Sequence, residues 1–260
     1  MSGPSFDPKY PEPVVVAVLD MLGARGIDEE IWAPIVGFAS GVISYPFGLP
    51  PISAGLPIGM VRQEDRDCIA ICLGLSSGNP AGSDGFFDFL DFATCRLLMH
   101  GYVLRGAVVT CMDTDYDAAL HYADQIQKRD AKFPRIVIAP APDGGGDHCL
   151  FFVPDSMTKG RGSNRRYPGL MRRSDDGIWW FDFFGYGGYF GRTPENSERR
   201  ICGRLNLALP VLRENLTRYA PSRSCEAKVR LKYVWLARRY NEAASTVGLD
   251  QIDLNAPDFK

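Results

Sequence analysis

Val14-Val15-Val16-Ala17-Val18-Leu19-Asp20-Met21-Leu22-Gly23 is a β-branched and aliphatic run that contains one carboxylate and stops at a glycine. A continuous apolar run of this length predicts a strand that is buried on both faces. Asp20 then stands at the end of a core strand, with Gly23 just beyond it. A carboxylate in this position either caps the following turn or serves as a ligand at the sheet edge.

Strand and helix patterns alternate along the rest of the chain. Further strands are expected at 42–45, 68–73, 106–111, 136–138 and 178–184, and helices at 28–40, 86–100, 116–130, 198–219 and 225–244. The Pro-rich stretch 46–57 predicts a loop or insertion, and 143–166 predicts a hairpin with mobile loops. The alternation indicates an α/β (α+β) fold. We expect a main domain over 1–190 and a C-terminal helical segment over 191–260, packed on the same domain.

Composition excludes several classes of protein. Of 260 residues, 45% are apolar and 23% are charged, which is typical of a soluble globular domain. A formal charge of −2 disfavours general nucleic-acid binding. The 7 cysteines form no CxxC pair, and neither a signal peptide nor a membrane-spanning run is visible, so we expect a cytoplasmic protein with reduced thiols and no membrane insertion. The three histidines lack metal-ligand spacing, so zinc is not expected.

A second carboxylate, Asp67, precedes the predicted strand 68–73. If this strand lies antiparallel beside the first one, Asp20 and Asp67 face the same spot. Mg²⁺ commonly rests on one or two carboxylates together with substrate phosphates, so this pair predicts a metal site. The alternative is that Asp20 caps a turn and Asp67 lies on a charged surface edge.

Four segments resemble the signatures of one enzyme family. They are 17–23, Arg105-Gly106-Ala107-Val108-Val109, Phe133-Pro134-Arg135-Ile136-Val137-Ile138, and the Lys-Tyr-x-Trp-Leu-Ala helix at 229–241. In this order and at these intervals, they resemble class III nucleotide cyclases of the bacterial Pycsar antiphage group. The resemblance covers most of the chain and implies a central, mainly antiparallel sheet flanked by helices.

The resemblance also implies an activity and its metal ions. It assigns Asp20 and Asp67 to two Mg²⁺ or Mn²⁺ ions per site, with a main-chain carbonyl near Met21 completing the ligand set. The expected reaction converts UTP to cyclic UMP and pyrophosphate as second-messenger synthesis in antiphage defence. A homodimer with its sites at the interface, and a cyclic-nucleotide-sensing effector, are implied too. The alternatives are a cytidylate cyclase, or an inactive domain that binds a nucleotide or a protein.

A pyrimidine pocket is a further implication of the resemblance. It places Tyr45 and Arg105 against the base, where Tyr45 would stack and Arg105 would donate to a base carbonyl or a phosphate. As alternatives, Tyr45 is a core-edge aromatic residue and Arg105 forms an ion pair at a strand end. The basic stretch from Lys159 to Arg173 either helps to neutralise triphosphate or forms a solvated face. Gly144-Gly145-Gly146 lacks the context of a P-loop and favours a flexible hairpin.

The chain departs from the family pattern in one helix. Relatives show Tyr-Glu-Leu-Glu where this chain has Asp124-Gln125-Ile126-Gln127, and Cys111 replaces a common glycine. The loss of the glutamates puts in doubt any role of this helix in ion pairing or in placing catalytic side chains. The metal aspartates are not affected.

Overall fold

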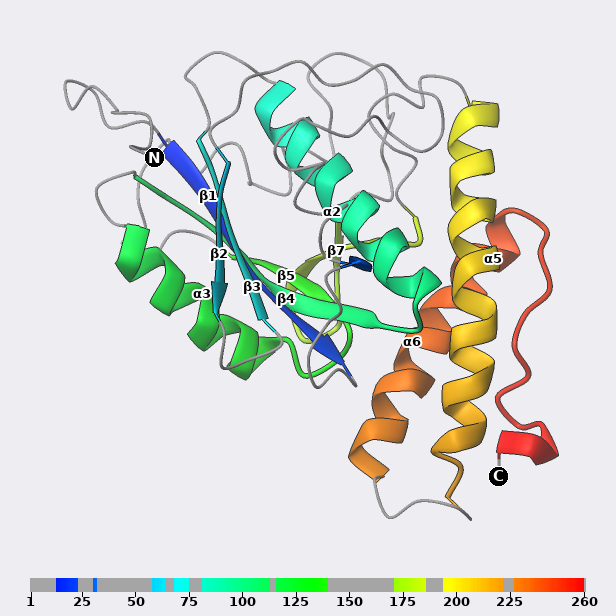
Figure 1. Cartoon of the computed structure of the whole chain (residues 1–260). Coiled ribbons are helices and arrows are strands. Elements are labelled where there is room, and N and C mark those ends of the chain that lie inside the picture. Colours follow the sequence, from blue (N-terminus) through cyan, green and yellow to red (C-terminus); the bar gives the residue numbers. More distant parts are fainter. Residues whose placement is uncertain are drawn as a thin grey trace.

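The computed structural model describes most of the sheet and the C-terminal helices (Figure 1). The described residues are 13–22, 30–31, 58–63, 68–74, 81–112, 116–139, 171–185, 194–221 and 227–259. The predicted strand 42–45, the loop 46–57 and the hairpin 143–166 lie outside them.

Within the described part of the chain, seven strands form one sheet in the order β2-β3-β1-β4-β5-β7-β6. Their bounds are β1 Pro13–Leu22, β2 Ile58–Gln63, β3 Cys68–Gly74, β4 Val103–Met112, β5 Ile136–Ala139, β6 Met171–Arg173 and β7 Trp179–Phe181. The pair β4 and β5 is parallel, and all other neighbouring pairs are antiparallel. The predicted α+β class with a mainly antiparallel sheet is therefore confirmed.

The first strand lies at the centre of the sheet. It pairs with β3 on one side and with β4 along its whole length on the other. Its residues Val15 to Leu19 are at most 4% exposed, which fits the prediction of a strand buried on both faces. The antiparallel pairing of the strands at 14–19 and 68–73, which the Asp20–Asp67 hypothesis requires, is present in the sheet.

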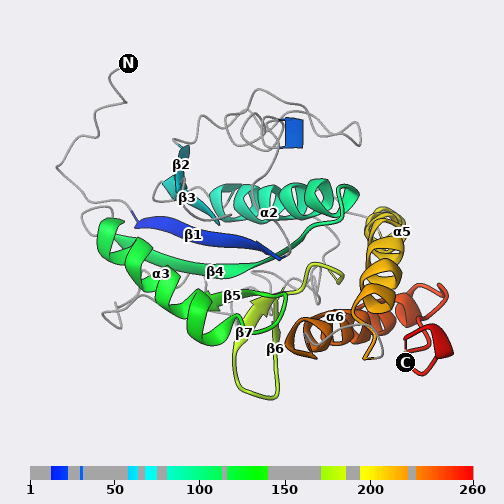
Figure 2. The ribbon, with the colours of Figure 1, turned by 60° about the horizontal axis from the view of Figure 1, so that its bottom comes forward.

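Helices cover both faces of this sheet and one of its ends. Their bounds are α2 Ala81–Met99, α3 Tyr116–Asp130, α5 Pro194–Arg218 and α6 Ala227–Thr246, and a short 3₁₀ helix covers Pro257–Phe259. Figure 2 shows α2 and α3 on opposite faces of the sheet, with α5 and α6 beyond one end. On the α3 face, small and β-branched residues that alternate along the strands, such as Val16, Val18, Ala107 and Val109, pack against Ala123 of α3.

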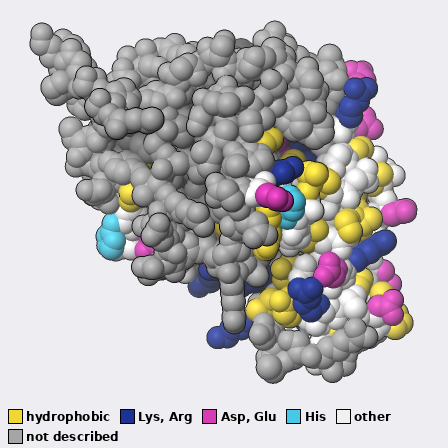
Figure 3. Space-filling view, viewed as in Figure 1, with side chains coloured by type: hydrophobic (Ala, Val, Ile, Leu, Met, Phe, Trp, Pro, Cys, Tyr) yellow, Lys and Arg dark blue, Asp and Glu magenta, His cyan; other side chains and the backbone are white. Residues whose placement is uncertain are grey.

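The C-terminal helices share a core with the rest of the molecule. Leu98 of α2, Val103 of β4 and Phe184 belong to the same buried cluster as Leu212 of α5 and Tyr240 of α6. Both helices lie within 191–260, and the division of the chain at residue 190 stays a prediction. In Figure 3 the described surface beside α5 and α6 carries basic and acidic side chains interspersed with apolar ones.

A buried ion pair joins α2 to α5. Arg204 donates from Nε to Asp91 Oδ1 at 2.5 Å and from Nη2 to Asp91 Oδ2 at 2.9 Å. Both side chains are at most 4% exposed. Burial and the neighbouring Asp91 raise the pKa of the Cys95 thiol well above its ordinary value, so this cysteine stays protonated.

A second charged group ties α6 to the outer strands. Arg172 of β6 donates to Glu242 of α6 at 2.8 Å, and Arg239 donates to the same carboxylate at 2.8 Å. Asp182, directly after β7, lies 3.6 Å from Arg172 and accepts a hydrogen bond from the Gly185 amide. Burial raises the pKa of Asp182 to about 6, although Arg172 opposes the shift.

We expect stability to fall as the pH rises through the range in which Asp182 ionises. The folded protein raises the pKa of Asp182 above the ordinary 3.8, so it binds more protons than the unfolded chain between pH 3.8 and about 6. This contribution is complete below pH 3.8, is lost above about pH 6, and amounts to at most about 3 kcal/mol.

The Asp182→Asn variant removes this titration but keeps an acceptor for the Gly185 amide. Urea unfolding of both proteins between pH 4 and pH 7 (about one point per half unit) measures the difference. The unfolding free energy of the variant, minus that of the wild type, should rise with pH. A constant difference would show that Asp182 does not titrate in this range.

Candidate functional site

An ion pair joins the ends of the two central strands. Asp20, near the end of β1, lies directly opposite Arg105 of β4 in the antiparallel register. Arg105 contacts Asp20 Oδ2 with Nε at 2.7 Å and with Nη2 at 2.5 Å. Both side chains are partly buried, with 25% of Arg105 and 21% of Asp20 exposed. The strand-end ion pair considered for Arg105 therefore exists, and it holds the predicted metal ligand.

A helix supplies the next contact. Gln127 of α3 donates from Nε2 to Asp20 Oδ2 at 3.2 Å. Its side chain is only 4% exposed, because α3 packs against β1 and β4 on this face of the sheet. Three donor atoms thus address Oδ2, and the described residues give Oδ1 no side-chain hydrogen bond.

Lys232 of α6 adds a second positive charge to this end of the sheet. Partial burial lowers the pKa of Lys232 below its ordinary value, the Arg105 cation lowers it further, and Asp20 acts in the opposite direction. The three charges therefore act on one another across β1, β4 and α6. Asp20 is therefore in direct contact with Arg105 and Gln127, and Lys232 is near enough to be influenced by the charges of Arg105 and Asp20.

On its other side, Asp20 faces the start of β3. Asp20 pairs with Cys68 in the antiparallel register. Asp67, the second predicted metal ligand, directly precedes Cys68 in the sequence but lies outside the described residues, as does Tyr45. The structure therefore brings Asp20 and Arg105 together and carries no information on the side chains of Asp67 and Tyr45.

The available oxygen ligands fit a hard divalent cation at Asp20. Oδ1 of Asp20 has no described partner, and Met21, whose side chain is 3% exposed, pairs with Leu104 but lies beyond the last register pair with β3. Among the described residues, no three His, Cys, Asp or Glu side chains gather into a metal site. A site of one or two carboxylates completed by phosphates is the kind that Mg²⁺ prefers.

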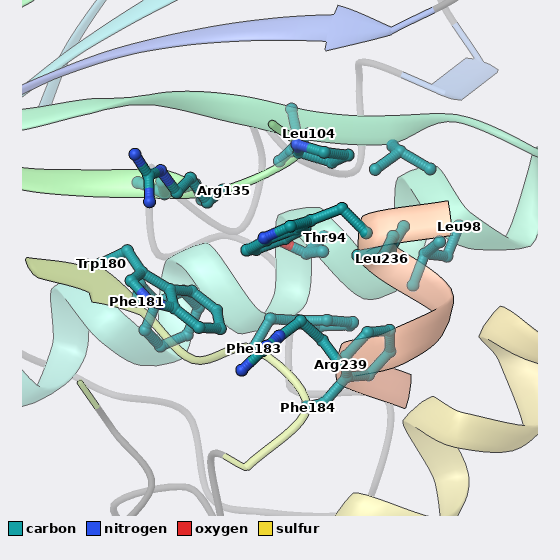
Figure 4. A pocket seen from close by; sticks show the side chains of 14 residues that line it. Thr94, Leu98, Leu104, Arg135, Trp180, Phe181, Phe183, Phe184, Leu236 and Arg239 are labelled. Carbon is teal, nitrogen blue, oxygen red and sulfur yellow. The ribbon is translucent and has the colours of Figure 1, made fainter. Parts of the chain in front are cut away.

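The cavity in Figure 4 is separate from this group. Its lining is mostly apolar and aromatic, including Leu98 of α2, Trp180 of β7 and Leu236 of α6. Leu104 of β4 also lines it. The α2 residues of the cavity place it on the face of the sheet that α2 covers, opposite the face that carries α3 and Gln127. The cavity therefore lies on the face opposite the Asp20 group.

Sequence analysis missed two members of the site. Gln127 was noted only as a departure from the family pattern, because a buried polar residue on an otherwise small and apolar helix face gives no sign of its partner. Lys232 belongs to the Lys-Tyr-x-Trp-Leu-Ala segment and was not assigned a role. Its position on α6, near a strand end far away in sequence, is a tertiary feature.

Comparisons with protein-family models, curated proteins and solved structures found no match to this chain. The resemblance to class III cyclases therefore rests on the sequence motifs alone. No described helix is long and apolar enough to cross a membrane.

Gly106 keeps β4 close enough to β1 for the site to form. A Cβ at this position would collide with the Val18 carbonyl oxygen and would lie 2.7 Å from Leu19 Cδ2 and 3.0 Å from Leu19 Cα. Two of these three atoms belong to the backbone, which cannot yield without separating the strands. The lack of space for a side chain therefore explains why position 106, next to Arg105, is a glycine.

We expect Gly106→Ala to destabilise the protein by more than about 2 kcal/mol, because β4 must shift from its register with β1. Gly203→Ala is the matched control, since a Cβ at Gly203 in α5 meets nothing within 4 Å. That change should be neutral or stabilising by about 0.5–1 kcal/mol. Chemical denaturation of both variants tests the claim, and equal stabilities would contradict it.

Proposed function

We propose that this protein is a pyrimidine nucleotide cyclase that converts UTP to cyclic UMP and pyrophosphate. One observation carries the proposal: the antiparallel register puts Asp20 between Arg105 and the residue that follows Asp67. The motifs at 17–23, 105–109, 133–138 and 229–241 agree with it. Under this proposal the fold is the class III cyclase fold, and the product is a second messenger in antiphage defence.

Asp20 and Asp67 would hold two Mg²⁺ or Mn²⁺ ions, with the Met21 carbonyl as a further ligand. The bound ions would supply activation of the ribose 3′-hydroxyl and charge neutralisation on the triphosphate. The cation of Arg105 and the nearby Lys232 of α6 add positive charge around Asp20, which would favour binding of a polyanion. Positioning of the 3′-oxygen in line with the α-phosphorus is then the main task of the protein.

Arg105 would also select the base. Its Nε and Nη2 atoms are engaged by Asp20, and its Nη1 atom has no described hydrogen bond. A donor that is fixed in direction by an ion pair suits a carbonyl oxygen of uracil better than the amino group of cytosine. Tyr45 is proposed as the stacking partner that leaves room for a single ring.

The assembly is part of the same proposal. A homodimer would complete each site with residues of the second subunit, and a cyclic-nucleotide-sensing effector would read the product. Action in the cytoplasm, where UTP is available, follows from this role.

A second candidate function is supported by the same ion pair. Asp20 already has a cation within its own chain, so its charge is compensated without any metal ion. A domain that binds a nucleotide or a protein without turnover would also keep this contact. Incubation with each triphosphate and Mn²⁺ separates the two functions, because a binding domain releases no pyrophosphate.

Removal of either metal ligand should abolish cyclisation. We expect Asp20→Asn and Asp67→Asn to lower cyclic nucleotide formation by at least about 100-fold, because an amide is a poor ligand for Mg²⁺ and lacks the charge. The Asn variants keep the size of the side chain and an acceptor for Arg105. Asp175→Asn, at an exposed turn position, is the control. Normal turnover by both variants would rule out the metal assignment.

Base selectivity should depend on Arg105. In a competition between equal amounts of the four triphosphates, the wild type should favour UTP over CTP by about tenfold or more, since an unpaired buried donor costs about 1–3 kcal/mol. Arg105→Lys keeps the cation beside Asp20 but loses the planar donor set, so the preference should fall towards unity. The Tyr45→Ala variant should convert a larger share of the purine triphosphates than the wild type does. Mass spectrometry measures the ratios of the cyclic products. Unchanged ratios in both variants would refute the assignment of Tyr45 and Arg105 to a base pocket.

A further inference from the structure

We infer that Gln127 of α3 is a positioning residue for the metal ligand: with Arg105 it holds Oδ2 of Asp20, so that Oδ1 is the oxygen presented to a divalent cation. The identity of the ligand chemistry rests on the proposed function. The geometry of the contact does not, since it follows from the distances of Arg105 and Gln127 to Asp20 alone.

All three hydrogen-bond donors contact Oδ2 of Asp20, and none of them contacts Oδ1. Arg105 approaches Oδ2 with two nitrogens, at 2.7 and 2.5 Å, and Gln127 approaches it at 3.2 Å. A carboxylate oxygen has two lone pairs, so three donors saturate it. A cation can then reach Asp20 only through Oδ1, for which the described residues provide no side-chain donor.

The burial of Gln127 indicates that its side-chain amide needs a hydrogen-bond partner. Gln127 is 4% exposed on a helix whose other buried residues, Ala119, Ala123 and Ile126, are apolar. A buried amide without a hydrogen bond costs several times more than an apolar side chain of the same size. Asp20 is the side-chain hydrogen-bond partner of Gln127 within the described structure. The contact therefore accounts for a polar residue at this place.

The neutral charge of Gln127 matters as well. A carboxylate in its place would repel Asp20 and compete for Arg105, which would turn the cation away from Oδ2. The amide instead donates to Asp20 and leaves the balance of one anion and one cation unchanged. The departure from the glutamate pattern on this helix thus has a physical reason in this chain.

Groups that orient a metal ligand affect metal affinity strongly. Loss of such a partner typically weakens binding by 10-fold or more, at the upper end about 100-fold. Without the Gln127 donor, Asp20 can rotate about its side-chain torsions and Oδ1 spends less time in the direction required for coordination. The expected effect is therefore on the metal affinity, with little effect on the fold.

The test compares Gln127→Met with Gln125→Met. Both changes replace a glutamine by an unbranched side chain of similar size on α3, but Gln125 is exposed and contacts His121, away from Asp20. Titration with Mn²⁺ alone, followed by electron paramagnetic resonance of the free ion, gives the dissociation constant. We expect an increase of about 10-fold for Gln127→Met and no change for Gln125→Met.

A second substitution at the same position serves as a control for misfolding. Gln127→Asn keeps the amide but withdraws it by one methylene, so the donor no longer reaches Oδ2, and Mn²⁺ binding should again weaken. Circular dichroism identifies the folded variants. Mn²⁺ affinity equal to that of the wild type in either folded Gln127 variant, or weakening of equal size in Gln125→Met, overturns the inference.

The same experiment separates this inference from the proposed function. A wild-type protein that binds Mn²⁺ with the expected Gln127 dependence, but forms no cyclic nucleotide, would retain the inference and reject the cyclase. An active cyclase whose Mn²⁺ affinity and Mn²⁺ requirement are unchanged in both folded Gln127 variants would retain the function and reject the inference. A wild type that binds no Mn²⁺ rejects the inference.

Discussion

The pairing of β1 on both of its edges is the constraint on which the site depends. Ladders to β3 and β4 fix every residue of β1 in register, and a slip of one residue would turn Asp20 to the other face of the sheet. Val15 to Leu19 are at most 4% exposed and pack on both faces of the sheet, so such a slip would disrupt the side-chain packing on both faces. The hydrophobic core therefore holds the carboxylate opposite Arg105, and the close approach at Gly106 allows it.

The central strands and long helices could be predicted because their patterns are strong. The run at 14–19 and the period of α3 gave the right elements, and the bounds 116–130 agree with Tyr116–Asp130. The missed strands, β2 and β6, are the two edges of the sheet. Edge strands carry charged residues such as Arg62 and Arg172, and β6 has only 3 residues, so no buried pattern marks them. The contact of Gln127 with Asp20 joins positions 107 apart in sequence, and only the tertiary packing shows it.

Under the proposed function, Arg105 would combine both roles considered for it: the ion pair with Asp20, which the structure shows, and the contact to a base, which is proposed. The ion pair with Asp20 fixes the direction of the guanidinium, and this orientation is what a base-reading donor requires. The structural and the functional interpretation therefore do not exclude each other. Asp20 in turn uses one oxygen for this internal contact. The same pair limits how closely a second cation can approach Oδ2.

The buried pair of Asp91 and Arg204 has a consequence for how the chain can be divided. Separation of the C-terminal helices would remove Arg204 from Asp91, and loss of one partner of a buried ion pair usually costs about 3–5 kcal/mol. It would also uncover Leu98, Val103 and Phe184, which share the core of α5 and α6. A fragment ending near residue 190 would therefore expose the apolar surface that now packs against α5 and α6, and the two segments should unfold as one cooperative unit.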